Sequence, residues 1–169
     1  MPGSLPNWPY PKLIAHRGAG RLAPENTLAA IRTGAQHGFA MMEFDVKLTR
    51  DDVPILLHDD TVDRTSNGTG AASQFKFREL AELDFGAWHS AAFAGEPIAT
   101  LGAVARFGLA NGLHANIEIK PSAGQEARTG HLVAEHAAAL WQYRPASCAS
   151  GPDRGYPGCG PDRRGLDRE

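Results

Sequence analysis

Short apolar runs alternate with amphipathic stretches along most of the chain. The continuous run Ile55-Leu56-Leu57 is typical of a strand covered on both faces, whereas Leu28, Ile31 and Ala35 follow helical spacing. We predict strands at 12–16, 41–48, 54–58 and 115–120, and helices at 26–37, 78–83, 101–110 and 125–141. This alternation favours an α/β fold built from four successive βα units around a parallel sheet.

Two segments depart from the alternation. Residues 59–100 form a long connection, which is usually functional or carries small structure of its own. From Gly151 to Glu169, fifteen of nineteen residues are Gly, Pro, Asp or Arg, so this end cannot supply a core. We predict a folded unit at 1–144 and a tail at 145–169, either a truncated or frameshifted end after about Arg144 or a disordered tail of similar composition.

Charge and hydropathy narrow the class of partner. The 169 residues carry a formal net charge of -2, with 17 basic and 19 acidic residues spread along the chain, which indicates no surface for nucleic acid or anionic lipid. No stretch approaches the ~20 apolar residues of a membrane span, and no charged leader precedes an apolar run. We expect a cytoplasmic protein that binds a small molecule.

Polar side chains stand at the carboxyl ends of the predicted strands, the face on which an α/β barrel builds its catalytic site. They are, strand by strand, His16 with Arg17, Glu43 with Asp45, His58, and Glu118 with Lys120. Residues two apart in a strand project to the same side. We therefore expect three carboxylates to converge, with basic side chains around them.

Converging carboxylates raise one another's pKa, and a divalent cation removes that cost. A first shell of carboxylate oxygens from Glu43, Asp45 and Glu118 suits Mg²⁺, Ca²⁺ or Mn²⁺ better than Zn²⁺. A single Glu-x-Asp in a strand is more often solvent-facing than a metal site. The joint placement of these residues at successive strand ends favours the metal site.

The basic residues fit an anionic phosphodiester. Arg17 and Lys120 place positive charge beside the predicted metal. His16 and His58 are the side chains suited to exchanging protons near neutral pH. Glu25 and Asn26 are weaker candidates for the site, because Pro24-Glu25-Asn26-Thr27 also fits an ordinary helix start.

The ordered set His16-Arg17, Glu43-x-Asp45 and His58 resembles the signature of the glycerophosphodiester phosphodiesterase family. The surrounding sequence segments also resemble those of the family: AHRGAGRLAPENTLAAI, EFDVKLTRDDVPILLHDDTVDRTSNGTG and NIEIKP. The resemblance runs from about Leu13 to Trp141. It implies a TIM (β/α)8-type barrel of which about the first four units are present, with the family's small insertion at 59–100.

The resemblance also implies metal-dependent hydrolysis of glycerophosphodiesters to glycerol 3-phosphate and an alcohol. The implied roles are metal binding by Glu43, Asp45 and Glu118, acid–base chemistry by His16 and His58, and phosphate binding by Arg17 and Lys120. Which histidine is the acid stays open, as does the choice among Mg²⁺, Ca²⁺ and Mn²⁺.

Other interpretations remain. The chain can be an inactive truncated fragment of such an enzyme, or a phospholipase D-like relative that acts on lysophospholipids. Half-barrels can also pair into an oligomer. A metal-dependent amidohydrolase or phosphotriesterase would need a second histidine two positions after His16, where this chain has Gly18.

Overall fold

Strand β1 (Met41–Leu48) is the centre of the sheet and is buried along its whole length. The computed structural model describes residues 9–142, in which the strand order is β2-β1-β3. Strand β3 (His114–Ile119) runs parallel to β1, in a register that places Asp45 opposite Glu118. The prediction for β1 is confirmed at both ends, and β3 begins and ends one residue before the predicted strand.

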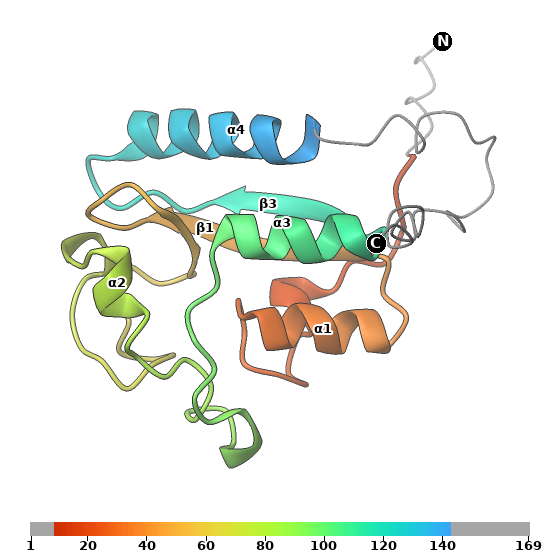
Figure 1. Ribbon diagram of the computed structural model, residues 1–169, viewed down its shortest axis with the longest axis horizontal. Coiled ribbons are helices and arrows are strands. Elements are labelled where there is room, and N and C mark those ends of the chain that lie inside the picture. Colours follow the sequence, from red (N-terminus) through yellow and green to blue (C-terminus); the bar gives the residue numbers. More distant parts are fainter. Residues whose placement is uncertain (1–8, 143–169) are drawn as a thin grey trace, which may run out of the picture.

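The two faces of β1 have different chemistry. Its even-numbered residues, Met42, Phe44, Val46 and Leu48, are at most 1% exposed and belong to the main hydrophobic core. That core also contains residues of α1 (Leu28–Gln36), α3 (Leu101–Ala110) and α4 (Glu126–Gln142), so the three long helices pack on one side of the sheet (Figure 1). Because side chains alternate along a strand, Glu43, Asp45 and Lys47 occupy the opposite face.

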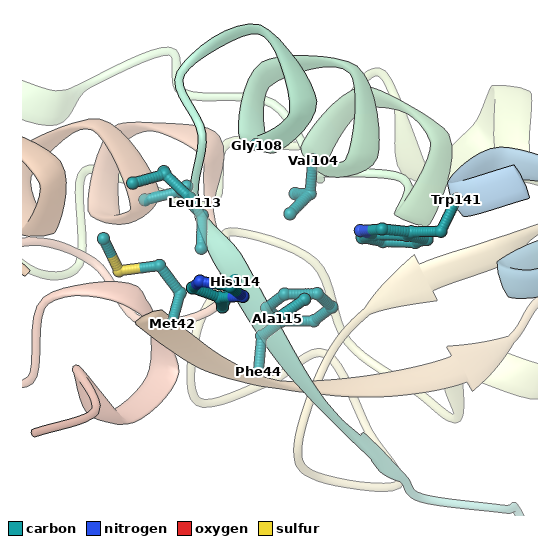
Figure 2. Close-up of a pocket in the computed structure, with 9 residues that line it drawn as sticks. Met42, Phe44, Val104, Gly108, Leu113, His114, Ala115 and Trp141 are labelled. Carbon is teal, nitrogen blue, oxygen red and sulfur yellow. The ribbon is translucent and has the colours of Figure 1, made fainter. Parts of the chain in front are cut away.

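The helix layer is closely packed against the sheet. Figure 2 shows side chains of β1, β3, α3 and α4 directed at one small space, with Val104 and Gly108 on α3 and Trp141 on α4. The space measures about 10 Å³ and its walls are apolar. It is a packing gap rather than a ligand site, because a cavity of this size holds a single water at most.

Threonines begin two of the helices. The Thr27 hydroxyl accepts from the backbone N–H of Ala30 at the start of α1, and Thr100 does the same for Ala103 at the start of α3. Both are typical N-caps. Helix α3 has the predicted bounds, α1 is shorter than the predicted 26–37, and α4 is displaced by one residue. No helix in residues 9–142 is long and apolar enough to cross a membrane.

The predicted first strand at 12–16 is wrong. Only Ala15 pairs, in a single parallel bridge to Met42, with its N–H 3.0 Å from the Met41 oxygen. The chain turns immediately afterwards, because His16–Gly18 form a 3-10 turn in which Arg17 has φ 51°. The bridge still holds His16 and Arg17 against the edge of β1.

The prediction that the strand at 54–58 belongs to the parallel sheet is also wrong. Strand β2 (Pro54–Leu56) runs antiparallel to β1 and is shorter than the predicted 54–58. The connection is a tight turn in which the Thr49 and Asp52 N–H groups donate to Val53 and Thr49 oxygens. A parallel neighbour would need a crossover of a dozen or more residues, so this turn permits only a hairpin.

The long connection at 59–100 has a small core of its own, shown yellow to green in Figure 1. It contains two 3-10 turns, Ala72–Gln74 and Ala91–Phe93, and the short helix α2 (Phe77–Leu80), where a helix at 78–83 was predicted. Its buried residues pack against Ile55 and Leu57. The predicted tail at 145–169 lies outside the described residues.

A glycine contact holds α1 against the turn that carries His16 and Arg17. A Cβ added to Gly34 would meet the Gly18 carbonyl, with the Met42 sulfur 3.0 Å away. Gly130, in α4, has nothing within 4 Å of its added Cβ.

We expect Gly34→Ala to lower the free energy of unfolding by about 1–3 kcal/mol, because overpacking forces the backbone to move. Gly130→Ala is the matched control and should raise it by about 0.5–1 kcal/mol through helix propensity. Urea denaturation of both variants tests the contact. Equal effects of the two substitutions would contradict it.

Candidate active site

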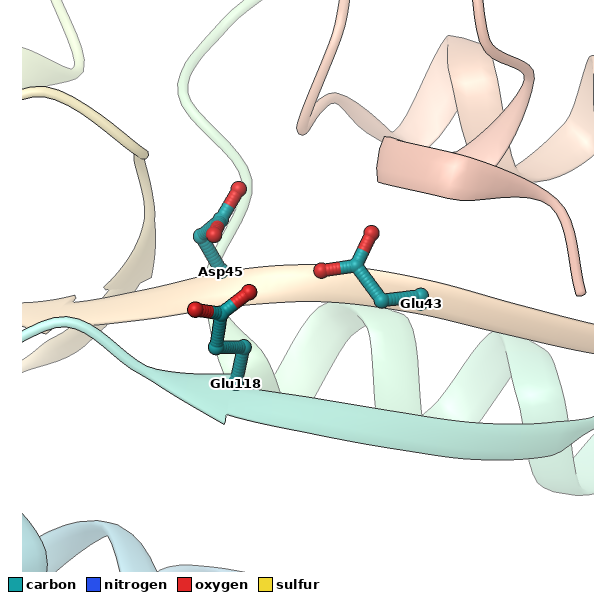
Figure 3. A group of neighbouring side chains, drawn as sticks. All are labelled: Glu43, Asp45 and Glu118. Carbon is teal, nitrogen blue, oxygen red and sulfur yellow. The ribbon is translucent and has the colours of Figure 1, made fainter.

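Three carboxylates converge on the sheet face away from the helices. Ligand oxygens of Glu43, Asp45 and Glu118 all lie within 4.8 Å of one another. Figure 3 shows the three side chains directed toward one another from β1 and β3. The parallel register that pairs Asp45 with Glu118 produces this approach. The expected convergence of the three carboxylates is present, although two of the four predicted strands differ in the structure.

The environment of Glu43 is costly for a negative charge. Burial raises the pKa of its carboxyl group, and the charges of Asp45 and Glu118 add to that effect. The Arg17 backbone N–H, 2.8 Å from Oε2, acts in the opposite direction without cancelling it. The other oxygen, Oε1, is buried and has no hydrogen-bond partner within residues 9–142.

A buried oxygen that has no partner in the described part of the chain, beside two further carboxylates, is a suitable ligand for a hard divalent cation. Burial without a partner is unfavourable for such an oxygen, and coordination would satisfy it. Glu118 contributes from the solvent side, since its side chain is 50% exposed. The donor set therefore fits Mg²⁺, Ca²⁺ or Mn²⁺ and lacks the nitrogen and sulfur ligands that Zn²⁺ favours.

Asn26 holds Asp45 from the edge of β1 that does not pair with β3. Its Nδ2 donates to Asp45 Oδ2 at 2.8 Å, and its Oδ1 accepts from the Asp45 backbone N–H at 3.0 Å. Asn26 thus occupies the gap in the β1 ladder between the Ala15 bridge and Leu57, whose N–H donates to the Asp45 oxygen. It is buried and has φ 58°, a conformation that asparagine tolerates better than most residues.

Arg17 and Lys120 flank the carboxylates as predicted. Arg17 Nε lies 3.5 Å from Asp45 Oδ2. The Lys120 ammonium lies 2.5 Å from Glu118 and 3.8 Å from Asp45. The hydrogen bond from Lys120 lowers the pKa of Glu118, and the same bond raises the pKa of Lys120. Both cations therefore stabilise the ionised cluster.

The two histidines differ in their surroundings. His16 has a 69% exposed side chain, with Nε2 3.9 Å from Glu43 Oε2. His58 is 34% exposed, and its Nδ1 lies 2.8 Å from Asp59 Oδ1. The β1–β2 hairpin returns His58 to the level of Asp45, because the preceding Leu57 N–H donates to the Asp45 oxygen.

Sequence reasoning missed four residues that support this site: Glu25, Asn26, Asp59 and Arg64. Glu25 and Asn26 were assigned to the helix start, although the cap itself is Thr27. Asparagine often adopts a positive φ, so that conformation could have been suspected at Asn26. Its contact with Asp45 could not, because the two residues are 19 positions apart. Asp59 could have been found from its place next to His58. Nothing in the spacing of Arg64 points to Glu25, 39 residues earlier.

Comparison with known proteins adds independent findings. Residues 16–153 match the profile described as the Glycerophosphoryl diester phosphodiesterase family. YhdW of Bacillus subtilis is 44% identical over 125 residues, which cover 73% of this chain and 51% of YhdW. A glycerophosphodiester phosphodiesterase of Caldanaerobacter subterraneus subsp. tengcongensis is 43% identical over 108 residues, covering 64% of this chain and 44% of the relative.

Solved structures agree with this match. A phosphodiesterase of Oleispira antarctica, in complex with the product sn-glycerol 3-phosphate, gives a TM-score of 0.73 at 37% identity and covers 80% of this chain and 54% of its own. The glycerophosphodiester phosphodiesterase of Agrobacterium tumefaciens gives 0.61 at 35% identity, covering 73% and 52%. The predicted fold class, a partial barrel of this type, is confirmed. The chain spans about half the length of these relatives.

Glu43→Gln should stabilise the protein when no divalent cation is present. The raised pKa of Glu43 means that ionisation opposes folding, so stability falls as pH rises from the ordinary value of 4.5 through the raised folded value. Urea midpoints in EDTA between pH 4.5 and 8 should show the variant gaining on the wild type as pH rises. Glu82→Gln, at an exposed position, is the control. A gain that does not depend on pH would contradict the electrostatic explanation.

Glu25→Gln should have the opposite effect. Burial opposes ionisation of Glu25, but hydrogen bonds from Arg64 and Arg17 outweigh it and lower its pKa. This stabilisation is present above pH 4.5 and is lost as pH falls through the lowered folded value. At pH 7 we expect a loss on the order of 2 kcal/mol, since charged hydrogen bonds are removed. In urea denaturation the loss should shrink toward acid pH, and a constant loss would contradict the prediction.

Proposed function

The chain belongs to the glycerophosphoryl diester phosphodiesterase family, and we propose on that premise that it hydrolyses glycerophosphodiesters to glycerol 3-phosphate and an alcohol. The observation that carries the proposal is the convergence of three carboxylates with Arg17, Lys120 and His16, beside which the chain returns His58 to the level of Asp45. The product complex of the Oleispira antarctica relative supports the same substrate class.

Glu43, Asp45 and Glu118 would hold one divalent cation, Mg²⁺ or Ca²⁺, with Mn²⁺ as an alternative. The bound ion would offset negative charge on the phosphoryl oxygens. Two features support this site: Glu43 Oε1 has no hydrogen-bond partner among residues 9–142, and Asn26 fixes Asp45. Such fixed carboxylates need little rearrangement to take up an ion.

Arg17 and Lys120 would bind the substrate phosphate. Their positive groups lie on either side of Asp45, at 3.5 Å and 3.8 Å. A phosphodiester that entered between them would gain two charge-assisted contacts. Because these groups are already held by carboxylates, they are oriented before the substrate arrives.

His16 and His58 would move the protons. One takes the proton of the attacking oxygen, and the other protonates the leaving alcoholate. Asp59 beside His58 can stabilise its imidazolium, and Glu43 lies close enough to His16 to do the same. A cytoplasmic location, the lack of a nucleic-acid partner and an oligomeric half-barrel stay predictions from the sequence.

The direct test is release of glycerol 3-phosphate from glycerophosphocholine and glycerophosphoethanolamine by the 169-residue chain, with Mg²⁺, Ca²⁺ or EDTA. We expect release that depends on the cation and falls about 10²–10⁴-fold in His16→Ala and His58→Ala. His136→Ala, on the exposed side of α4, is the matched control and should retain activity.

Two outcomes would contradict the proposal. No release from folded protein would favour an inactive fragment, and faster turnover of lysophosphatidylcholine than of either glycerophosphodiester would favour the phospholipase D-like alternative.

A further inference from the structure

One arginine of the 59–100 connection reaches two carboxylates at the edge of the site. Arg64 Nε and Nη2 donate to the two oxygens of Asp59, at 2.7 and 3.1 Å. Nη1 and Nη2 also donate to the two oxygens of Glu25, both at 2.8 Å. A single guanidinium therefore forms two bidentate pairs, which fix both partners in position and direction.

Both carboxylates contact residues of the proposed catalytic machinery. Asp59 Oδ1 lies 2.8 Å from His58 Nδ1, and Glu25 Oε1 accepts from Arg17 Nη1 at 2.6 Å. Arg17 in turn reaches Asp45. The result is a continuous series of ion pairs and hydrogen bonds that links Asp45, Arg17, Glu25, Arg64, Asp59 and His58.

The series determines which nitrogen of His58 carries a proton. An ionised carboxylate only accepts hydrogen bonds, so Nδ1 beside Asp59 must be the protonated nitrogen. Hydrogen bonds from Arg64 keep the pKa of Asp59 well below its usual range, which keeps it an acceptor. Nε2 is then the atom that can exchange a proton with substrate.

We propose that Arg64 is a positioning residue, which orients His58 through Asp59 and Arg17 through Glu25 and so couples the 59–100 connection to both sides of the site. The inference deepens the proposed function, on which it rests for its catalytic meaning. The Arg64 side chain is 45% exposed, so its ion pairs contribute less to stability than the more buried pair of Arg17 with Glu25. Arg64 acts by fixing the positions of Asp59 and Glu25.

The experiment uses the 169-residue chain with ¹⁵N-labelled histidine at pH 8. In the wild type we expect the His58 ring signals of the Nδ1–H tautomer. Arg64→Ala should give a mixture of both tautomers, because Asp59 is no longer held. Arg64→Lys keeps the positive charge but cannot form bidentate hydrogen bonds, so it should give an intermediate mixture. If the alanine variant does not fold, the lysine variant serves as the test.

Arg50→Ala is the matched control. Its side chain is 50% exposed and makes one contact with a carboxylate, 3.4 Å from Glu79. It should leave the His58 signals unchanged. In turnover of glycerophosphocholine, we expect kcat to fall about 10–100-fold in Arg64→Ala, by analogy with the loss that follows removal of the hydrogen-bond partners of metal ligands.

A folded Arg64 variant with the wild-type His58 tautomer would overturn the inference. Failure of the proposed function looks different. A wild-type chain with no turnover would refute the activity, while the ring signals would still decide whether Arg64 orients His58.

Discussion

Mutual repulsion of carboxylates is the constraint to which the rest of this site responds. Ligand oxygens of three acidic residues lie within 4.8 Å of one another; two of these residues are on the buried strand β1 and the third is on β3. The positive charges of Arg17 and Lys120 offset part of that repulsion, as do the N–H groups of Arg17 and Asn26 that donate to the carboxylates. The pKa of Glu43 nevertheless stays raised, because the carboxyl group is buried and the charges of Asp45 and Glu118 add to that effect. Ionisation of Glu43 therefore opposes folding, and a cation bound at this cluster would remove that cost.

The opposite face of the same strand provides the rigidity. Apolar side chains of β1 interlock with three helices, and α1 approaches so closely that Gly34 has no room for a methyl group. That approach fixes the short turn from His16 to Gly18 against the sheet edge. Strand β1 therefore separates the apolar helix layer from the polar face that carries the candidate site.

The sequence predicted elements better than their directions. The bounds of β1 and α3 were right, because each apolar pattern is long and ends at clear turn or cap residues. The direction of β2 depends on the turn at 49–53, and an apolar strand pattern carries no information about direction. The convergence of Glu43, Asp45 and Glu118 could be predicted from spacing within strands. The supporting contacts of Asn26 and Arg64 cross 19 and 39 residues, so no periodicity reveals them.

The β1–β2 turn has a consequence for how this region can vary. Strand β2 pairs through three residues, and the turn sets its register against β1. One inserted residue would slide β2 by about 3.3 Å and rotate His58 toward the helix layer, since strand side chains alternate. Substitutions in the turn leave this relation intact. Related chains should therefore differ in the composition of the turn and agree in its length.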